Sequence, residues 1–260
     1  MNAVAGNSFA SVAAAVALGD WARARTELRR VQQTSGPDLA MQVQAWSYRI
    51  APFWWTPLQG GGVALRRCRA DDADFFSSCF SDREFSTQYN RQQPWTGDLA
   101  KALTKVGTLS PVDLKALHWI VTDKSDHAIG LASLTSLNLA NRKAEFSIGF
   151  PSLGATRSTK AFSPATMVTL LAFHFAFFVA RLNKLTAYIY RGNDGALRNA
   201  QHIGFQIEGL LKDHFYLPPG EFVDVHVLGL TRAQLQANPA ILRMARRRLG
   251  LDWTLARTVK

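Results

Sequence analysis

The chain has 260 residues, 47% of them hydrophobic and 19% charged, which allows one or two domains with a buried core and excludes a collagen-like, coiled-coil or wholly disordered chain. The formal net charge is +11, and more than half of this excess lies in residues 231–260, so the main body does not have the charge of a nucleic-acid-binding surface. Two cysteines exclude a disulfide framework, and neither they nor the six histidines have the spacing of metal ligands, so we expect a reducing compartment and no metal.

The first 51 residues are expected to be helical. Asn7 or Ser8, and then Asp20, are suited to cap two successive helices, and Pro37 suits the first turn of a third. The alanine-rich start has no Lys or Arg before its apolar run, which argues against a secretory signal and predicts a cytoplasmic protein.

We predict a helical cap over residues 1–51 that is too short for a core of its own. We therefore expect it to pack on the rest of the chain or on a second subunit. The apolar side chains that need cover there are Trp21, Leu28, Val31, Met41, Val43 and Trp46.

Residues 52–62 are predicted to be a linker, because they combine two prolines with three successive glycines. Beyond it, the alternation of apolar and polar residues predicts strands interrupted by helices. The strands are expected at 63–69, 118–123, 127–138 and 143–150, and the helices at 70–80 and 99–107.

Residues 161–180 form an uncharged, mostly apolar segment that is long enough to span a bilayer. The segment contains Thr166, Thr169 and His174, however, and no second apolar segment of this length occurs in the chain. We therefore favour a helix buried between a sheet and other helices, with His174 as a hydrogen-bonded core residue, and predict no membrane span.

The remaining pattern predicts a strand at 185–190, a helix at 194–203 and two strands joined by a turn at Pro218–Gly220. This order of elements implies a mixed sheet with helices on its faces. Residues 233–260 are predicted to be a basic helical tail that packs on the core or on a second subunit. Its arginines form a solvated face or meet an acidic partner.

Two stretches of the chain carry a family resemblance. Residues 144–150 (AEFSIGF) and 193–215 (NDGALRNAQHIGFQIEGLLKDHF) resemble the central strand and the N-x-x-S-x-R…GF…EG…RD stretch of the GNAT superfamily of acyl-CoA N-acyltransferases, most closely its RimJ/RimL branch. The matching residues of the second stretch are Asn193, Arg198, Gly204, Phe205, Glu208, Gly209 and Asp213. The resemblance implies an α/β fold over residues 63–232, with a mixed, largely antiparallel sheet flanked by helices and an N-terminal helical extension.

The resemblance also implies a site for acetyl-CoA as co-substrate. The phosphate loop of the family aligns with the start of the uncharged helix, where backbone N–H groups, the helix dipole and nearby cations favour a pyrophosphate. The alternative is an ordinary capped helix start with two solvated bases. The expected cofactor-binding residues are Phe146, Ser147, Ile148, Arg157, Ser158, Thr159, Lys160, Ala161, Phe162, Ser163, Asn193 and Arg198.

Acyl transfer from a thioester requires a positioned neutral amine, removal of a proton and protonation of the thiolate. Glu145, on the central strand, is the carboxylate best placed to relay a proton through water, and the alternative is an acid paired with Arg142 or Lys143. The family's usual acid positions hold Ala196 and Ala200 here. The candidates for the proton donor are therefore Asn193, Tyr190, Tyr188 and water. The predicted catalytic residues are Glu145, Asn193 and Tyr190.

The predicted function is transfer of an acetyl or another short acyl group from acyl-CoA to a primary amine. The acceptor is an amino sugar, an antibiotic or another small amine, or else a protein N-terminus. The alternative is a catalytically silent module of the same fold that binds CoA or serves as a scaffold. The further partners predicted are a second copy of the chain in a homodimer and, as the alternative to a solvated face, an acidic partner for the basic tail.

Overall fold

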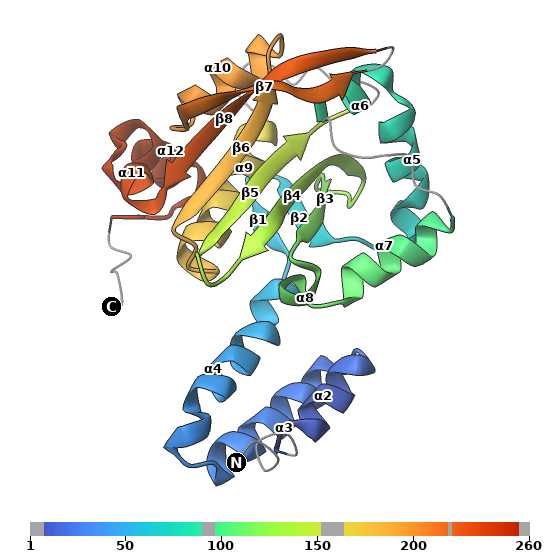
Figure 1. Cartoon of the computed structure of the whole chain (residues 1–260), viewed down its shortest axis with the longest axis vertical. Helices are drawn as coiled ribbons and strands as arrows, with labels where there is room; N and C mark the ends of the chain where they lie inside the picture. The colour runs from blue at the N-terminus through green and yellow to red at the C-terminus, as the bar shows by residue number, and fades with distance from the viewer. Residues whose placement is uncertain (1–7, 90–96, 152–163, 218–219, 255–260) are drawn as a thin grey trace. The chain divides into compact units, whose positions relative to one another are not determined.

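The computed structural model describes residues 8–89, 97–151, 164–217 and 220–254 (Figure 1). The chain forms two compact units. The first comprises Met1–Thr56 and Thr108–Leu114, and the second comprises Pro57–Gly107 and Lys115–Lys260.

Helices make up the first unit, and the helix Trp21–Thr34 begins at the predicted cap Asp20. The helix Ala10–Ala17 has Phe9 at its N-cap position and no side-chain cap, so the cap expected at Asn7 or Ser8 is wrong for this helix. The Asp20 side chain accepts a hydrogen bond of 2.9 Å from the backbone N–H of Arg23, and Pro37 opens the turn between the next two helices. The described elements are α2 (Ala10–Ala17), α3 (Trp21–Thr34), the 3-10 turn η1 (Pro37–Leu39), α4 (Ala40–Arg49), the 3-10 turn η2 (Pro52–Trp54) and α8 (Pro111–Leu114).

The first unit buries an apolar cluster of its own, so the expectation that residues 1–51 have no core is wrong. The helices present apolar stripes with a spacing of three or four residues, as at Ala24, Leu28 and Val31, and these stripes pack on one another. Met41, expected among the covered groups, is 81% exposed, because it lies two positions from buried Val43 and on another side of α4.

An eight-stranded sheet forms the centre of the second unit, with the strand order β1-β2-β3-β4-β5-β6-β8-β7. Neighbouring strands pair antiparallel, except that β5 and β6 are parallel. The predicted α/β fold, with a mixed and largely antiparallel sheet, is confirmed. The strands are β1 (Leu58–Gly60), β2 (Val63–Arg67), β3 (Leu117–Thr122), β4 (Ala128–Asn138), β5 (Lys143–Gly149), β6 (Lys184–Tyr190), β7 (Gln206–Leu217) and β8 (Glu221–Thr231).

The segment predicted as a linker contains strand β1, which its prolines and glycines did not predict. Gly60 pairs with Val63, and the two residues between them, Gly61 and Gly62, have φ values of 55° and 83°. Two successive residues with positive φ form the tight turn that suits the twist of a β-hairpin, and glycine adopts it without strain. The glycines that suggested a linker therefore make a hairpin.

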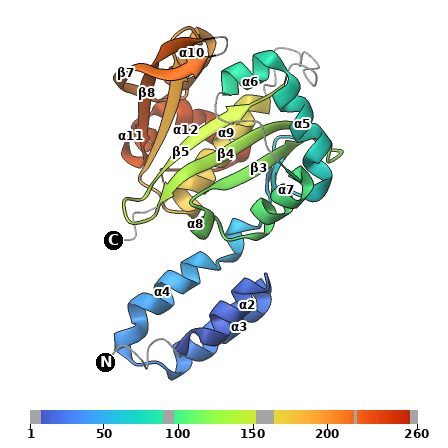
Figure 2. The same cartoon turned by 45° about the vertical axis from the view of Figure 1, so that its right-hand side comes forward.

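Helices cover both faces of the sheet, and alternation along β3 shows the two sides (Figures 1 and 2). Trp119 contacts the ring of Phe175 at 5.4 Å, whereas Ile120 joins a buried cluster that includes Phe76 and Leu103 on the opposite face. The helices of the second unit are α5 (Ala73–Ser81), α6 (Arg83–Tyr89), α7 (Leu99–Thr108), α9 (Pro164–His174), α10 (Asp194–His202), α11 (Arg232–Ala237) and α12 (Pro239–Leu249), with the 3-10 turn η3 (Ala70–Asp72) and the π-helical turn η5 (Phe175–Val179).

The uncharged segment forms α9 and η5, which are buried against the sheet as predicted. Residues 167–173 are all buried, and the rings of Phe146 and Phe173 lie 5.7 Å apart. No helix in the described part of the chain combines the length and the apolar character that a membrane crossing requires.

The basic tail packs on the second unit, as predicted, through α12 and Trp253. Ile241 and Ala245 are buried, and the Trp253 indole N–H donates a 3.2 Å hydrogen bond to Nδ1 of His174. His174 thus has the hydrogen bond expected of a core histidine. Its Nδ1 accepts this bond in the neutral form, and burial lowers the pKa of His174.

Candidate active site

The two parallel strands at the centre of the sheet pair at one end only. Lys143, Ala144 and Glu145 of β5 pair with Lys184, Leu185 and Thr186 of β6, and beyond these positions the two strands separate (Figure 1). On its other side β5 stays paired with β4 as far as Gly149, and β6 stays paired with β8 as far as Tyr190. Beyond these positions, the backbone groups on the facing edges of β5 and β6 are therefore not hydrogen-bonded to each other, although both strands lie inside the sheet.

A cavity of about 730 Å³ occupies this opening. Its volume lies within the range typical of small-molecule sites. The lining residues come from α6, β5, α9, β6 and α10 and the loops beside them: Gln88, Tyr89, Phe146, Ser147, Ile148, Gly149, Phe150, Ala165, Thr166, Thr169, Ala187, Tyr188, Ile189, Tyr190, Gly192, Asn193, Asp194, Gly195, Ala196, Asn199, Ala200, His202, Ile203 and Phe205.

The structure brings together the predicted residues of the two central strands. Phe146, Ser147 and Ile148 line the cavity from β5, and Tyr190 lines it from β6. Glu145 is 7% exposed and does not line the cavity; it lies at the last position where β5 still pairs with β6. Its register partners are Thr135 on β4 and Thr186 on β6, so these three side chains share one face of the sheet.

Asn193 joins the cavity as the N-cap of α10. Its Oδ1 accepts a hydrogen bond of 3.1 Å from the backbone N–H of Ala196. No residue that the structure describes accepts a hydrogen bond from the Asn193 side-chain amide, so this donor stays available at the cavity. Arg198, on the same helix, is exposed and does not line the cavity.

The environment of Tyr190 favours its protonated form. Burial raises the pKa of the Tyr190 hydroxyl, and the carboxylate of Glu84 on α6 raises it further. Tyr190 therefore keeps its proton at neutral pH and is a potential donor at the cavity wall.

Comparison with known proteins identifies this arrangement. The family model of the acetyltransferase (GNAT) domain matches residues 63–206, which is more than half of the chain. The chain belongs to the GNAT acetyltransferase family. It is accordingly an acetyl-CoA-dependent N-acetyltransferase, and the comparisons leave its assignment to the RimJ/RimL branch a prediction.

One relative of this acetyltransferase is an uncharacterized N-acetyltransferase p20 of Bacillus licheniformis. It is 26% identical over 175 residues, which cover 66% of this chain and 94% of the relative. The matched solved structures include a spermidine N-acetyltransferase from Vibrio cholerae in complex with CoA and spermine, with 22% identity, a TM-score of 0.57 and coverage of 67% of this chain and 98% of that chain. A dodecameric form of the Vibrio cholerae enzyme has a TM-score of 0.55 at 22% identity and covers 69% of this chain and 98% of that chain.

The predicted phosphate loop of the acetyltransferase, Arg157 to Ser163, lies outside the described residues. The cavity also has polar lining residues that were not predicted as site residues. Thr166 and Thr169 line it from α9, and Asn199 and His202 line it from α10. The sequence contained a signal for the two threonines, because they are polar residues three positions apart on one side of an otherwise apolar helix.

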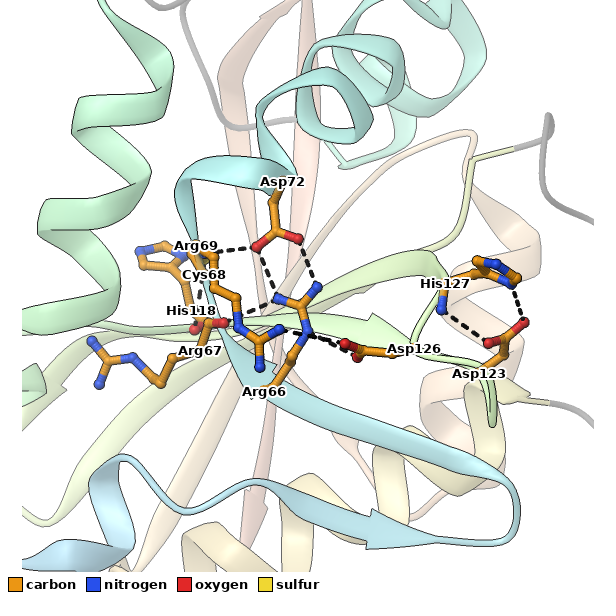
Figure 3. A network of polar contacts seen from close by, with 9 residues as sticks. All are labelled: Arg66, Arg67, Cys68, Arg69, Asp72, His118, Asp123, Asp126 and His127. Carbon is orange, nitrogen blue, oxygen red and sulfur yellow. Dashed lines mark hydrogen bonds and ion pairs between the residues drawn. The ribbon is translucent and has the colours of Figure 1, made fainter.

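A second polar cluster of the acetyltransferase lies at the end of β2, away from the cavity (Figure 3). Two nitrogens of the Arg66 guanidinium donate to the two carboxylate oxygens of Asp72 at 2.7 and 2.9 Å, and its Nε donates to Asp126 at 3.1 Å. Asp72 also accepts from the backbone N–H of Arg69 at 2.7 Å. The hydrogen bonds that Asp72 accepts from Arg66 raise the pKa of the Arg66 guanidinium. The charged groups of Arg66 and Asp72 thus find their partners within the cluster.

The described residues offer little support for other chemistries. They contain no group of three or more His, Cys, Asp or Glu that could hold a metal ion. Burial raises the pKa values of Cys68 and Cys79 to about 12, so both thiols stay protonated at neutral pH and are poor nucleophiles.

Proposed function

We propose that the cavity holds the acyl thioester of acyl-CoA, and that an acetyl or other short acyl group is transferred there to a small primary amine. The observation that carries this proposal is the opening between β5 and β6. Backbone groups on an unpaired strand edge bind an extended ligand that carries amides, in the way that a further strand is added to a sheet. The pantetheine arm of CoA is such a ligand.

The chain's own groups match the steps of the transfer. The neutral amine nitrogen attacks the thioester carbonyl carbon, a C–N bond forms, the C–S bond breaks, and the thiolate takes a proton. We assign protonation of the thiolate sulfur to Tyr190, whose raised pKa keeps the donor in its acidic form. Glu145 accepts the proton of the amine through water, since it is buried behind the cavity wall, and the Asn193 amide orients the reacting groups.

The outer part of CoA is proposed to bind at the start of α9. Arg157, Ser158, Thr159, Lys160, Ala161, Phe162 and Ser163 would contact the pyrophosphate through their N–H groups and their two cations. Arg198, exposed on α10, would contact the outer part of the molecule.

The charge of the cavity favours a cationic acceptor. Asp194 lines it, Glu84 acts on Tyr190 from α6, and no Lys or Arg is among its described lining residues. An acidic wall attracts an ammonium group, whereas an acceptor with a carboxylate near its amine is repelled. Amino sugars, aminoglycoside antibiotics and polyamines have this positive charge, and the solved structures of similar fold include spermidine acetyltransferases.

The test is a titration with acetyl-CoA by calorimetry, followed by thiol-release assays across spermidine, glucosamine, an aminoglycoside and an N-terminal peptide. We expect micromolar binding of acetyl-CoA and turnover of one of the small cationic amines. The Asp194→Asn variant should raise KM for that amine severalfold and leave KM for acetyl-CoA unchanged, and Asp224→Asn, outside the cavity, is the matched control.

Two outcomes would contradict the proposal. Binding of acetyl-CoA without turnover of any amine would favour the catalytically silent module. Turnover of the N-terminal peptide alone would contradict the small cationic acceptor but leave the acyl transfer itself intact.

A further inference from the structure

The first unit contains a groove that the acetyltransferase chemistry does not use. Two hollows of about 430 and 420 Å³ lie along α3 and α4, and they share Gln32 and Ser47. The first is lined by Gln32, Ser35, Gly36, Pro37, Ala40, Val43, Gln44 and Ser47, and the second by Arg25, Leu28, Arg29, Gln32, Ser47, Ile50, Ala51 and Pro52. Because Gln32 and Ser47 line both hollows, the two hollows adjoin each other along α3 and α4, and together they are called the groove.

Helical spacing explains why these residues face the same groove. On α3, residues 25, 28, 29 and 32 follow the spacing of one helix face, and residues 40, 43, 44 and 47 do so on α4. From Arg25 to Gln32 the groove follows α3 over roughly 10 Å at 1.5 Å per helical residue, and it continues past the end of the helix to Gly36. The helical part alone matches about three residues of extended peptide at 3.3 Å each.

The floor of the groove is apolar and its rim is polar. Leu28, Val43 and Ile50 are buried beneath it. Gln32, Gln44 and Ser47 are exposed, and their side chains make no hydrogen bond within the described part of the chain. A peptide backbone lying in the groove would thus find both donors and acceptors.

Positive charge lies along one side of the groove. Arg25 and Arg29 are one helical turn apart, and no carboxylate pairs with either of them among the residues that the structure describes. The nearby acid Glu27 is on another face of α3 and pairs with Arg30 at 2.8 Å. No Asp or Glu lines either hollow.

We propose that this groove binds an extended peptide segment with acidic side chains. Carboxylates of the segment pair with the guanidinium groups of Arg25 and Arg29, its backbone bonds to Gln32, Gln44 and Ser47, and an apolar side chain covers Leu28. We infer an acidic peptide from charge complementarity, because the residues lining the groove include two guanidinium groups and no carboxylate. The site would recruit a partner protein, and it does not depend on acyl transfer.

The experiment is fluorescence anisotropy with the full-length chain and a labelled Glu-Leu-Glu-Leu-Glu peptide, next to its Gln-Leu-Gln-Leu-Gln counterpart. We expect the acidic peptide to bind at least tenfold more tightly than the neutral one, and its affinity to fall as salt is raised. The double variant Arg25→Gln/Arg29→Gln should weaken the acidic peptide about tenfold. The double variant Arg23→Gln/Arg30→Gln removes the same charge from α3 outside the groove and should change the affinity less than twofold.

Arg25 also donates a hydrogen bond to the backbone oxygen of Ile50, so replacing it could weaken peptide binding by destabilising the fold. A variant that is expected to bind the peptide more tightly separates the two causes. Gln44→Lys adds a cation to the opposite wall and should tighten the acidic peptide severalfold, whereas Gln44→Glu should weaken it. Equal binding of both peptides, or equal loss in the two arginine double variants, overturns the proposal. So does tighter binding of a single-stranded oligonucleotide at Arg25 and Arg29 than of the acidic peptide, because the partner would then be a nucleic acid.

Discussion

The Arg66 cluster and the β5–β6 cavity belong to the same unit and both gather ionisable side chains, but those side chains differ in what they bond to. In the cluster, Arg66 and Asp72 are buried and bond to each other and to their neighbours (Figure 3). In the cavity, Tyr190 and Asn193 are among the lining residues, beside the point where the two strands separate.

This difference shows that the number of titratable groups does not by itself identify a site. A buried ion pair with complete hydrogen bonds has no donor or acceptor left for a ligand, and removing one partner leaves the other charge buried and uncompensated. A polar group at an open strand edge costs some stability and is available for binding. We therefore expect mutations in the cluster to act on stability and mutations in the cavity to act on turnover.

The largest expected effect is on the cluster. Asp72→Asn leaves the Arg66 guanidinium buried without its main partner and should lower the free energy of unfolding by about 3–5 kcal/mol. Asp126→Asn is the matched control, because the Asp126 side chain is 58% exposed, and it should cost at most about 1 kcal/mol. Urea denaturation measures both, and equal losses would contradict the assignment of Asp72 as the central partner.

The next effect is on turnover. Tyr190→Phe removes the proposed proton donor and should lower kcat about 100-fold, with little change in melting temperature. Tyr216→Phe, on exposed β7, should have no effect on kcat. A larger loss in Tyr188→Phe than in Tyr190→Phe would transfer the donor role to Tyr188, the alternative on the same strand.

The third effect is a dependence of stability on pH. Burial, with a contribution from Arg67, lowers the pKa of His118 to about 4. The unfolded chain binds a proton near pH 6.5 and the folded chain only near pH 4, so this contribution is complete above pH 6.5 and is lost as the pH falls toward 4. We expect a loss of about 2 kcal/mol between pH 7 and pH 5.

The control for this pH effect is a second histidine. His118→Gln should remove most of that slope, while His127→Gln, whose side chain is 77% exposed, should keep it. His174 also has a lowered pKa and adds to the slope in the same direction. A slope unchanged in His118→Gln would contradict the burial of this imidazole.

The smallest expected effect concerns Asn193, which both caps α10 and lines the cavity. Asn193→Ala removes the cap of α10 and should cost about 1 kcal/mol of stability, and it should also lower kcat, because the same residue lines the cavity. Asp20→Ala removes an equivalent cap from α3, which has no part in the cavity. It should cost a similar amount of stability, and turnover per folded molecule should not change.

Local pattern was enough to predict most elements of the second unit. The strands at 143–150 and 185–190, the helix after Asn193 and the buried helix within residues 161–180 follow from strand alternation, caps and the absence of charge. The hairpin of β1 and β2 was missed, although Gly61 and Gly62 are the signal for it. A glycine run is compatible with a linker and with a tight turn, and only the partner strand decides between them.

The sequence by itself determined the order of the elements, the helix caps and the residues that lie near the central strands, because these depend on neighbours within one or two turns of chain. Only the tertiary structure decided that β5 and β6 separate after Glu145, that Asn199 and not Arg198 lines the cavity, and that Arg66 finds Asp72 and Asp126. These features depend on register and on contacts between segments far apart in the chain. A one-residue shift in a strand or a 100° turn around a helix reverses which side chains face the cavity.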